Sequence, residues 1–148
     1  MPTAERRAEV VWNGNLQSGS GTFDLASSGA WTGANVSFAT RTENPNGNTS
    51  PEELMAAAHA SCYAMALSLV LGERGTPPES IDVQAACTLD DVPEGFRITT
   101  MDLDVRGRVP GINAEGFRSA AEHAHQICPV SNALKDNVEV RVNTTLED

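Results

Sequence analysis

One apolar stretch in the first half of the chain constrains the fold more than any other feature. Residues 54–71, LMAAAHASCYAMALSLVL, place apolar side chains on nearly every side of a helix, interrupted by His59 and two serines. Pro51, followed by two glutamates, suits the first turn of this helix, and Gly72 suits its end. A helix that is apolar all round must be covered on more faces than one small sheet offers. We therefore predict a long, buried central helix, and we expect a second copy of the chain to cover part of it.

Strand-like alternation of apolar and polar residues flanks this helix on both sides. We expect strands at residues 8–13, 21–25, 31–39, 81–89, 96–109 and 138–146. A shorter amphipathic helix is expected over residues 113–127, with a further helical turn starting at Pro129. Hairpin-like connections within each group of strands favour an α+β fold with mostly antiparallel sheets over a parallel, doubly wound one. The length of 148 residues suits a single domain, 1–148.

The charge balance argues against one class of partner. The chain carries 20 acidic and 10 basic residues, and Lys135 is its single lysine, so no basic patch is available to neutralise a nucleic-acid backbone. The first twelve residues, MPTAERRAEVVW, lack the apolar core of a secretion signal, and polar residues interrupt the helix at residues 54–71. We therefore expect a cytoplasmic protein with no nucleic-acid or membrane partner.

Three cysteines in a reducing compartment do not form a structural disulfide framework, so a pair that does bond is expected to cycle between oxidised and reduced states. Cys62 lies in the middle of the apolar helix, where both packing and chemistry are open to it. A thiolate there lacks the field of a helix amino terminus and would need a neighbouring cation. Arg41, in the turn-rich segment before the helix, is the candidate. Cys87 falls in a strand-like segment without charged neighbours, and we assign it to packing.

Cys128 precedes Pro129, and a residue before proline is pushed out of the helical region. Cys128 is therefore expected near the N-cap of a new helical turn, where free amides would stabilise a thiolate. From these local effects alone, Cys128 is better placed than Cys62 to react as a thiolate.

Glu52 has the simple role of a first-turn helix carboxylate, and helix geometry limits any other. Ten positions separate Glu52 from Cys62, which is roughly 15 Å along an unbroken helix. If both belong to one site, then an arginine bridges them, the helix breaks, or the glutamate comes from another copy of the chain.

Two other hypotheses compete with thiol chemistry. Histidine and cysteine cluster in two segments, which could together form a metal-binding site from His59, Cys62, His123, His125 and Cys128. Neither segment has the paired spacing of a zinc knuckle or the HExxH motif of a metalloprotease. The second alternative is a non-enzymatic dimer whose apolar interface binds a lipid-like ligand and whose cysteines are inert.

Residues 50–69, SPEELMAAAHASCYAMALSL, and residues 127–135, ICPVSNALK, resemble the two signature stretches of the osmotically inducible protein C and organic hydroperoxide resistance (OsmC/Ohr) family. The resemblance extends to the Trp-x-Gly at Trp12 and to the VPGI at residues 109–112. The chain is more similar to the OsmC branch, because the arginine that matches the family's active-site arginine follows the third expected strand, as Arg41.

The resemblance implies a thiol peroxidase that reduces organic hydroperoxides, on an interlocked α+β homodimer with two sites at the subunit interface. Cys62 matches the peroxidatic cysteine and Cys128 the resolving cysteine, which reverses the ranking from local physics. Arg41 and Glu52 match the pair that holds and polarises the reacting thiolate.

The resemblance also implies the course of the reaction. Cys62 is expected to pass through a sulfenic acid and then a disulfide with Cys128. No bound cofactor is needed, because an external dithiol, of which a lipoyl protein is one form, reopens the disulfide. The sequence leaves open the preferred hydroperoxide, the use of hydrogen peroxide, the physiological reductant and the subunit that supplies each site residue.

Overall fold

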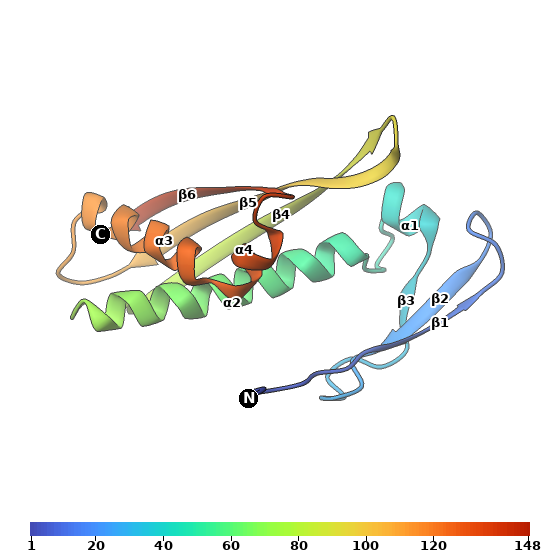
Figure 1. The fold of residues 1–148 in the computed structure, drawn as a ribbon, viewed down its shortest axis with the longest axis horizontal. Coiled ribbons are helices and arrows are strands. Elements are labelled where there is room, and N and C mark those ends of the chain that lie inside the picture. The colour runs from blue at the N-terminus through green and yellow to red at the C-terminus, as the bar shows by residue number, and fades with distance from the viewer. The chain divides into compact units, whose positions relative to one another are not determined.

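The computed structural model describes residues 1–148, which divide into two compact units. Unit 1 is Met1–Pro51, and unit 2 is Glu52–Asp148. Figure 1 shows unit 1 in blue to cyan and unit 2 from green to red.

Unit 1 is built on a three-stranded antiparallel sheet in the order β1 (Glu9–Asn13), β2 (Ser20–Asp24) and β3 (Ala34–Val36). The third predicted strand, residues 31–39, is wrong at both ends, because only residues 34–36 pair. A short helix, α1 (Phe38–Thr42), follows instead. The Ser37 hydroxyl accepts a hydrogen bond from the backbone N–H of Thr40 at 3.1 Å, which is the N-cap contact that begins a helix.

The Trp-x-Gly stretch has a local structural role in this sheet. The Trp12 indole N–H donates to the backbone oxygen of Gly14 at 2.9 Å. Trp12 also lies against Gly21 on the neighbouring strand, where an added Cβ would come within 2.9 Å of the indole ring. Gly14 has a φ of +92°, which favours glycine. The motif therefore fixes the ring and the turn after β1.

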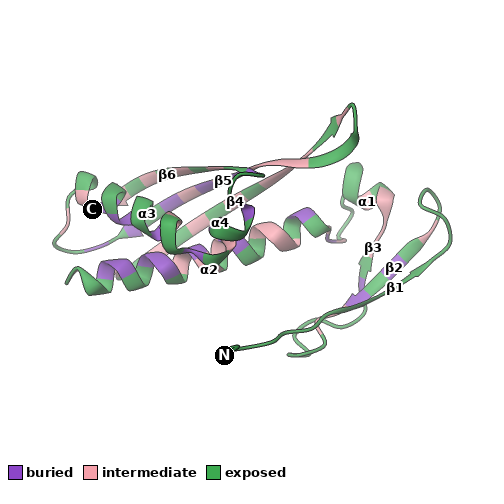
Figure 2. Ribbon diagram, in the orientation of Figure 1, coloured by how far each residue is buried: buried purple, intermediate pink, exposed green.

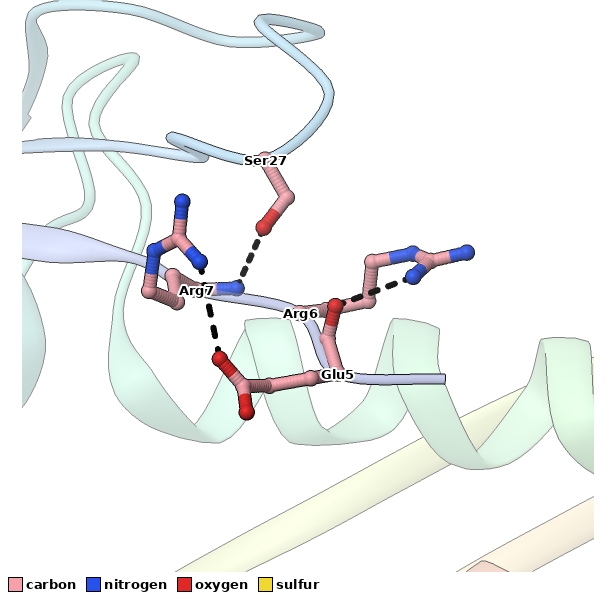
Figure 3. Close-up of polar contacts among 4 residues, drawn as sticks. All are labelled: Glu5, Arg6, Arg7 and Ser27. Atoms are coloured by element: carbon pink, nitrogen blue, oxygen red, sulfur yellow. Dashed lines mark hydrogen bonds and ion pairs between the residues drawn. The ribbon is translucent and has the colours of Figure 1, made fainter. Parts of the chain in front are cut away.

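The chain before β1 is fastened to the turn after β2 (Figure 3). The backbone N–H of Arg7 donates to Ser27 Oγ at 2.6 Å, and the backbone N–H of Ser27 donates to the oxygen of Arg7 at 3.1 Å. An exposed ion pair joins Arg7 to Glu5 at 3.5 Å, and Arg6 donates to the backbone oxygen of Glu5. Because exposed ion pairs contribute little to stability, the backbone contacts with Ser27 hold this segment.

Unit 2 combines a long helix, a three-stranded sheet and two shorter helices. Its elements are α2 (Pro51–Glu73), β4 (Ser80–Val92), β5 (Gly95–Arg108), α3 (Ala114–Ile127), α4 (Pro129–Leu134) and β6 (Glu139–Glu147). The sheet order is β4-β5-β6, in which β4 and β5 pair antiparallel. β5 and β6 pair parallel, because α3 and α4 form the crossover between them. The α+β prediction is confirmed, with this one parallel pair.

The sheet of unit 2 buries one face. Met101, Leu103 and Val105 of β5 are fully buried and pack with residues of α2 and α3 in one core cluster. Figure 1 shows both helices lying along the sheet. The alternate residues on the other face are polar, and Arg141 pairs there with Asp102 at 3.5 Å. This alternation is typical of a sheet with one solvated face.

Helix α2 buries one side within its own chain and leaves the other open (Figure 2). The buried side includes Tyr63, Leu67 and Val70, whereas Met65 is 72% exposed and Leu69 is 54% exposed. Burial on every side, as predicted from the sequence, is therefore not reached within a single chain. By length and composition alone α2 could cross a membrane, but the core helix of a soluble protein passes the same test. Its packing against the sheet favours a core helix.

Candidate active site

The two cysteines that the sequence singles out meet in unit 2. Cys62 is half-buried on α2, Cys128 is fully buried at the junction of α3 and α4, and both are free thiols. Cys62 packs against the core cluster that includes Cys128, and Cys128 is near enough to act on the pKa of the Cys62 thiol. The fold therefore brings two thiols from distant parts of the sequence near one another.

Cys128 owes its position to the proline that follows it. Its backbone is extended, with φ −64° and ψ 119°, so that it ends α3 and begins α4. The backbone N–H of Cys128 donates to the oxygen of Ala124 at 2.8 Å, and the oxygen of Cys128 accepts from Asn132 at 3.0 Å. The predicted N-cap position is confirmed, with Pro129 in the first turn of α4. The thiol makes no capping hydrogen bond and is free to face α2.

The immediate surroundings favour the neutral form of Cys62. Burial raises the pKa of its thiol, and the Cys128 side chain acts in the same direction. A hydrogen bond from the backbone of Val130, in the first turn of α4, lowers the pKa but does not outweigh the other contributions. A reactive thiolate at Cys62 therefore requires a further positive group.

Glu52 lies in the first turn of α2 and is only 7% exposed. The helix is unbroken from Pro51 to Glu73, so Glu52 and Cys62 are separated by roughly 15 Å along its axis, and a broken helix is excluded. Glu52 lies near Cys87 on β4. Burial raises the pKa of the Cys87 thiol, and the negative charge of Glu52 raises it further.

Arg41 lies on α1 of unit 1, in the last turn of that helix. Its backbone N–H donates to the oxygen of Ser37 at 3.1 Å. Its partnership with Cys62 and Glu52 stays a prediction.

Two of the three histidines form a hydrogen-bonded network with Ser131. No three side chains among histidine, cysteine, aspartate and glutamate are grouped to hold a metal ion. His59 Nε2 lies 2.7 Å from Ser131 Oγ, and His125 Nδ1 lies 3.0 Å from the same oxygen. His123 is exposed on α3. The sequence reasoning missed this network, although Ser131 follows Cys128 at the same spacing of three residues that separates His59 from Cys62.

Comparisons with known proteins identify the family of this chain. Residues 44–143 match the family described as "OsmC-like protein". The chain is 43% identical over 136 residues to Peroxiredoxin OsmC of Escherichia coli, which covers 92% of this chain and 94% of that protein. It is 31% identical over 93 residues to the organic hydroperoxide resistance protein of Xanthomonas axonopodis pv. citri, which covers 62% of this chain and 63% of that protein.

The fold is also that of solved structures in this group. The organic hydroperoxide resistance protein OhrB of Bacillus subtilis superposes with a TM-score of 0.72 at 25% identity, over 94% of this chain and 98% of that one. An OsmC protein of Legionella pneumophila superposes with a TM-score of 0.74 at 22% identity, over 98% of this chain and 99% of that one. With the family match, these similarities show that the chain belongs to the OsmC-like protein family, closer to its OsmC branch than to its Ohr branch.

Proposed function

We propose that this protein reduces organic hydroperoxides, with Cys62 as the attacking thiol and Cys128 as the thiol that resolves the oxidised product. The observation that carries the proposal is that the fold brings Cys62 and Cys128 near one another in the core of unit 2. Relatives named a peroxiredoxin and an organic hydroperoxide resistance protein support the substrate class.

The reaction follows from the two thiols. The Cys62 thiolate attacks the distal oxygen of the hydroperoxide, the O–O bond breaks, and the alkoxide takes up a proton to leave as the alcohol. Cys62 is then a sulfenic acid. Cys128 attacks its sulfur, the S–O bond breaks, and water leaves with the proton of the Cys128 thiol. An external dithiol, such as a lipoyl group, reduces the resulting disulfide and is itself oxidised to a disulfide.

Arg41 supplies the positive charge that Cys62 requires, and Glu52 holds the guanidinium by charge-assisted hydrogen bonds. Because roughly 15 Å of unbroken helix separates Glu52 from Cys62, we place the glutamate that serves a given Cys62 on a second copy of the chain.

An intertwined homodimer fits the exposed apolar side chains. Met65 and Leu69 on α2 and Val10 and Val11 on β1 are all more than half exposed. Large apolar side chains left exposed on both units of a single chain are what a second subunit would cover. We place the dimer in the cytoplasm, where dithiol reductants keep thiols reduced.

Turnover tests the proposal directly. Consumption of an alkyl hydroperoxide and of hydrogen peroxide is measured with dihydrolipoamide and with a monothiol as alternative electron donors. We expect fast turnover with the alkyl hydroperoxide and dihydrolipoamide, complete loss in Cys62→Ser, and full activity in the control Cys87→Ser. A wild-type thiol that reacts no faster than free cysteine would refute the proposal and favour the non-enzymatic dimer.

A further inference from the structure

A hydrogen bond joins the two segments that carry the thiols. His59 lies three residues before Cys62 on α2, and Ser131 lies three residues after Cys128 on α4. Residues three apart on α2 share one side, one turn apart. The hydrogen bond between His59 Nε2 and Ser131 Oγ, at 2.7 Å, therefore lies one turn of α2 from Cys62. The segment Cys128–Ser131 therefore lies beside α2 at two positions one turn apart, Cys62 and His59.

The contact continues toward the surface through a second histidine. His125 Nδ1, at the end of α3, lies 3.0 Å from the same Ser131 oxygen. His59 is fully buried and Ser131 is 2% exposed, whereas His125 is half-buried and lines a cavity of about 250 Å³ that also contacts Ser131. A single serine hydroxyl thus connects the interior beside the thiols to a solvent-facing cavity.

We propose that His59, Ser131 and His125 form a positioning network that holds Cys128 beside Cys62 for disulfide closure, and that protonation of His125 weakens it. The proposal deepens the proposed function, and its role in turnover rests on that function.

The positions of the protons follow from one unpaired atom. His59 Nδ1 is buried and has no hydrogen-bond partner. A proton on that nitrogen would bury a donor without an acceptor, so neutral His59 carries its proton on Nε2. His59 Nε2 then donates to Ser131 Oγ, and the Ser131 hydroxyl donates to Nδ1 of a neutral His125.

Protonation of His125 reverses this chain. A charged imidazole carries hydrogen on both nitrogens, so His125 must donate to Ser131 instead of accepting from it. The Ser131 oxygen can then accept from both histidines, which leaves its own hydroxyl hydrogen without an acceptor in a site that is 2% exposed. If the hydroxyl turns toward His59 Nε2 instead, the proton of His59 is forced onto the unpaired Nδ1. Addition of a second proton to His59 is also unfavourable, because burial and then the charge of His125 lower the pKa of His59. The donors of this network therefore all have acceptors only while His125 is neutral.

The charged groups that face His125 across its two adjoining cavities are of both signs. The charged groups are Arg118 and Glu122 from α3 and Lys135 and Asp136 from the α4–β6 connection. β6 contributes only the uncharged Val140, Val142 and Thr144. α2 contributes the titratable His59. Neither sign prevails in this set.

The test measures disulfide closure without any peroxide. The Cys87→Ser protein, which retains only the two relevant thiols, is equilibrated with reduced and oxidised glutathione. Free thiols are then alkylated, and mass spectrometry gives the fraction of the protein with a Cys62–Cys128 disulfide. The readout is the effective concentration of one thiol toward the other. Since glutathione exchange replaces two thiols with two thiols, no net proton is released below the thiol pKa values, and a pH dependence between pH 5.5 and 8 reports another titrating group.

Ser131→Ala removes the shared hydroxyl and is expected to lower the effective concentration about tenfold at pH 8. In the protein with Ser131 intact, the value is expected to fall as the pH drops from 8 to 5.5. His125→Gln keeps a side chain that can reach Ser131 but cannot gain a proton, so this fall should disappear. The exposed His123 provides the matched control, because His123→Gln should keep the fall.

An unchanged effective concentration in Ser131→Ala would overturn the proposal, as would a pH response that survives in His125→Gln. Circular dichroism and urea unfolding establish that each variant is folded, and the half-buried site of His125 makes His125→Gln the safe variant if Ser131→Ala unfolds. Peroxide turnover is measured separately on the wild type. Ready closure with glutathione but no peroxide consumption would refute the proposed function and leave the network supported.

Discussion

A tight contact between β5 and α3 gives a prediction whose size can be worked out. Gly107 lies against the ring of Phe117, and a Cβ added at Gly107 would lie 2.4 Å from two of its ring carbons. Carbon atoms pack best at about 3.5–4.0 Å, so the ring or the strand would have to move by roughly 1 Å. Phe117 is 1% exposed and has no open space to enter. Gly107→Ala should therefore strain the packing that sets α3, and with it Cys128, against the sheet.

Two opposing contributions decide the net effect of Gly107→Ala. Overpacking a well-filled core costs about 1–3 kcal/mol. Alanine in place of glycine inside a strand stabilises the folded state by about 0.5–1 kcal/mol, because the unfolded chain loses conformational freedom. We expect a net loss of about 1–2 kcal/mol, which for a chain of this length lowers Tm by about 3–6 °C.

Urea unfolding followed by circular dichroism measures this loss. Gly72→Ala is the matched control, because an added Cβ there meets nothing within 4 Å, and alanine in this helix should raise stability by up to about 1 kcal/mol. Combining Gly107→Ala with Phe117→Leu should cost less than the sum of the two single changes, because the smaller side chain relieves the clash. A Gly107→Ala protein as stable as the wild type, or strictly additive costs, would refute the placement of α3 on β5.

Three further changes test the account. Met65→Glu with Leu69→Glu should shift a dimer toward monomer in analytical ultracentrifugation, and an unchanged sedimentation coefficient would remove these side chains from the interface. Burial lowers the pKa of His59 in the folded state, so the unfolded chain binds more protons and stability is lost as pH falls below about 6.5. The free energy of unfolding of His59→Gln should therefore depend less on pH between 8 and 5 than that of the wild type. An equal slope in the two proteins would contradict this. Arg41→Lys keeps the charge but loses the planar guanidinium, so peroxide turnover should fall about tenfold or more, and a wild-type rate would exclude the guanidinium clamp.

The sequence predicted most of the elements of unit 2 because their signals are local and strong. Pro51 marks the start of α2 and Pro129 the start of α4, as the structure confirms. The hairpin of β4 and β5 reaches further than expected, to Val92 and Gly95, with a register shift between Thr88 and Leu89. The five-residue α1 was missed, because so short a helix has no periodic pattern and depends on one serine cap. The parallel pairing of β5 with β6 depends on long-range contacts that no local pattern records.

The candidate site was predictable only in part. Local physics favoured Cys128 as the attacking thiol, and the resemblance to a family reversed the roles of the two cysteines. The proximity of the thiols depends on how α3 and α4 fold back on α2, which sequence alone does not determine. His59 and His125 were considered only as metal ligands, because no local pattern shows that Ser131, within the second signature stretch, joins them.

The most direct test of the central claim is peptide mapping after one equivalent of an alkyl hydroperoxide. Reduced protein is oxidised, its remaining thiols are alkylated, and the protease digest is analysed by mass spectrometry. The account predicts the loss of two thiols per peroxide, a disulfide between Cys62 and Cys128, and an alkylated Cys87. Peroxide consumption with Cys62 still free, or a disulfide that leaves out Cys128, would contradict it.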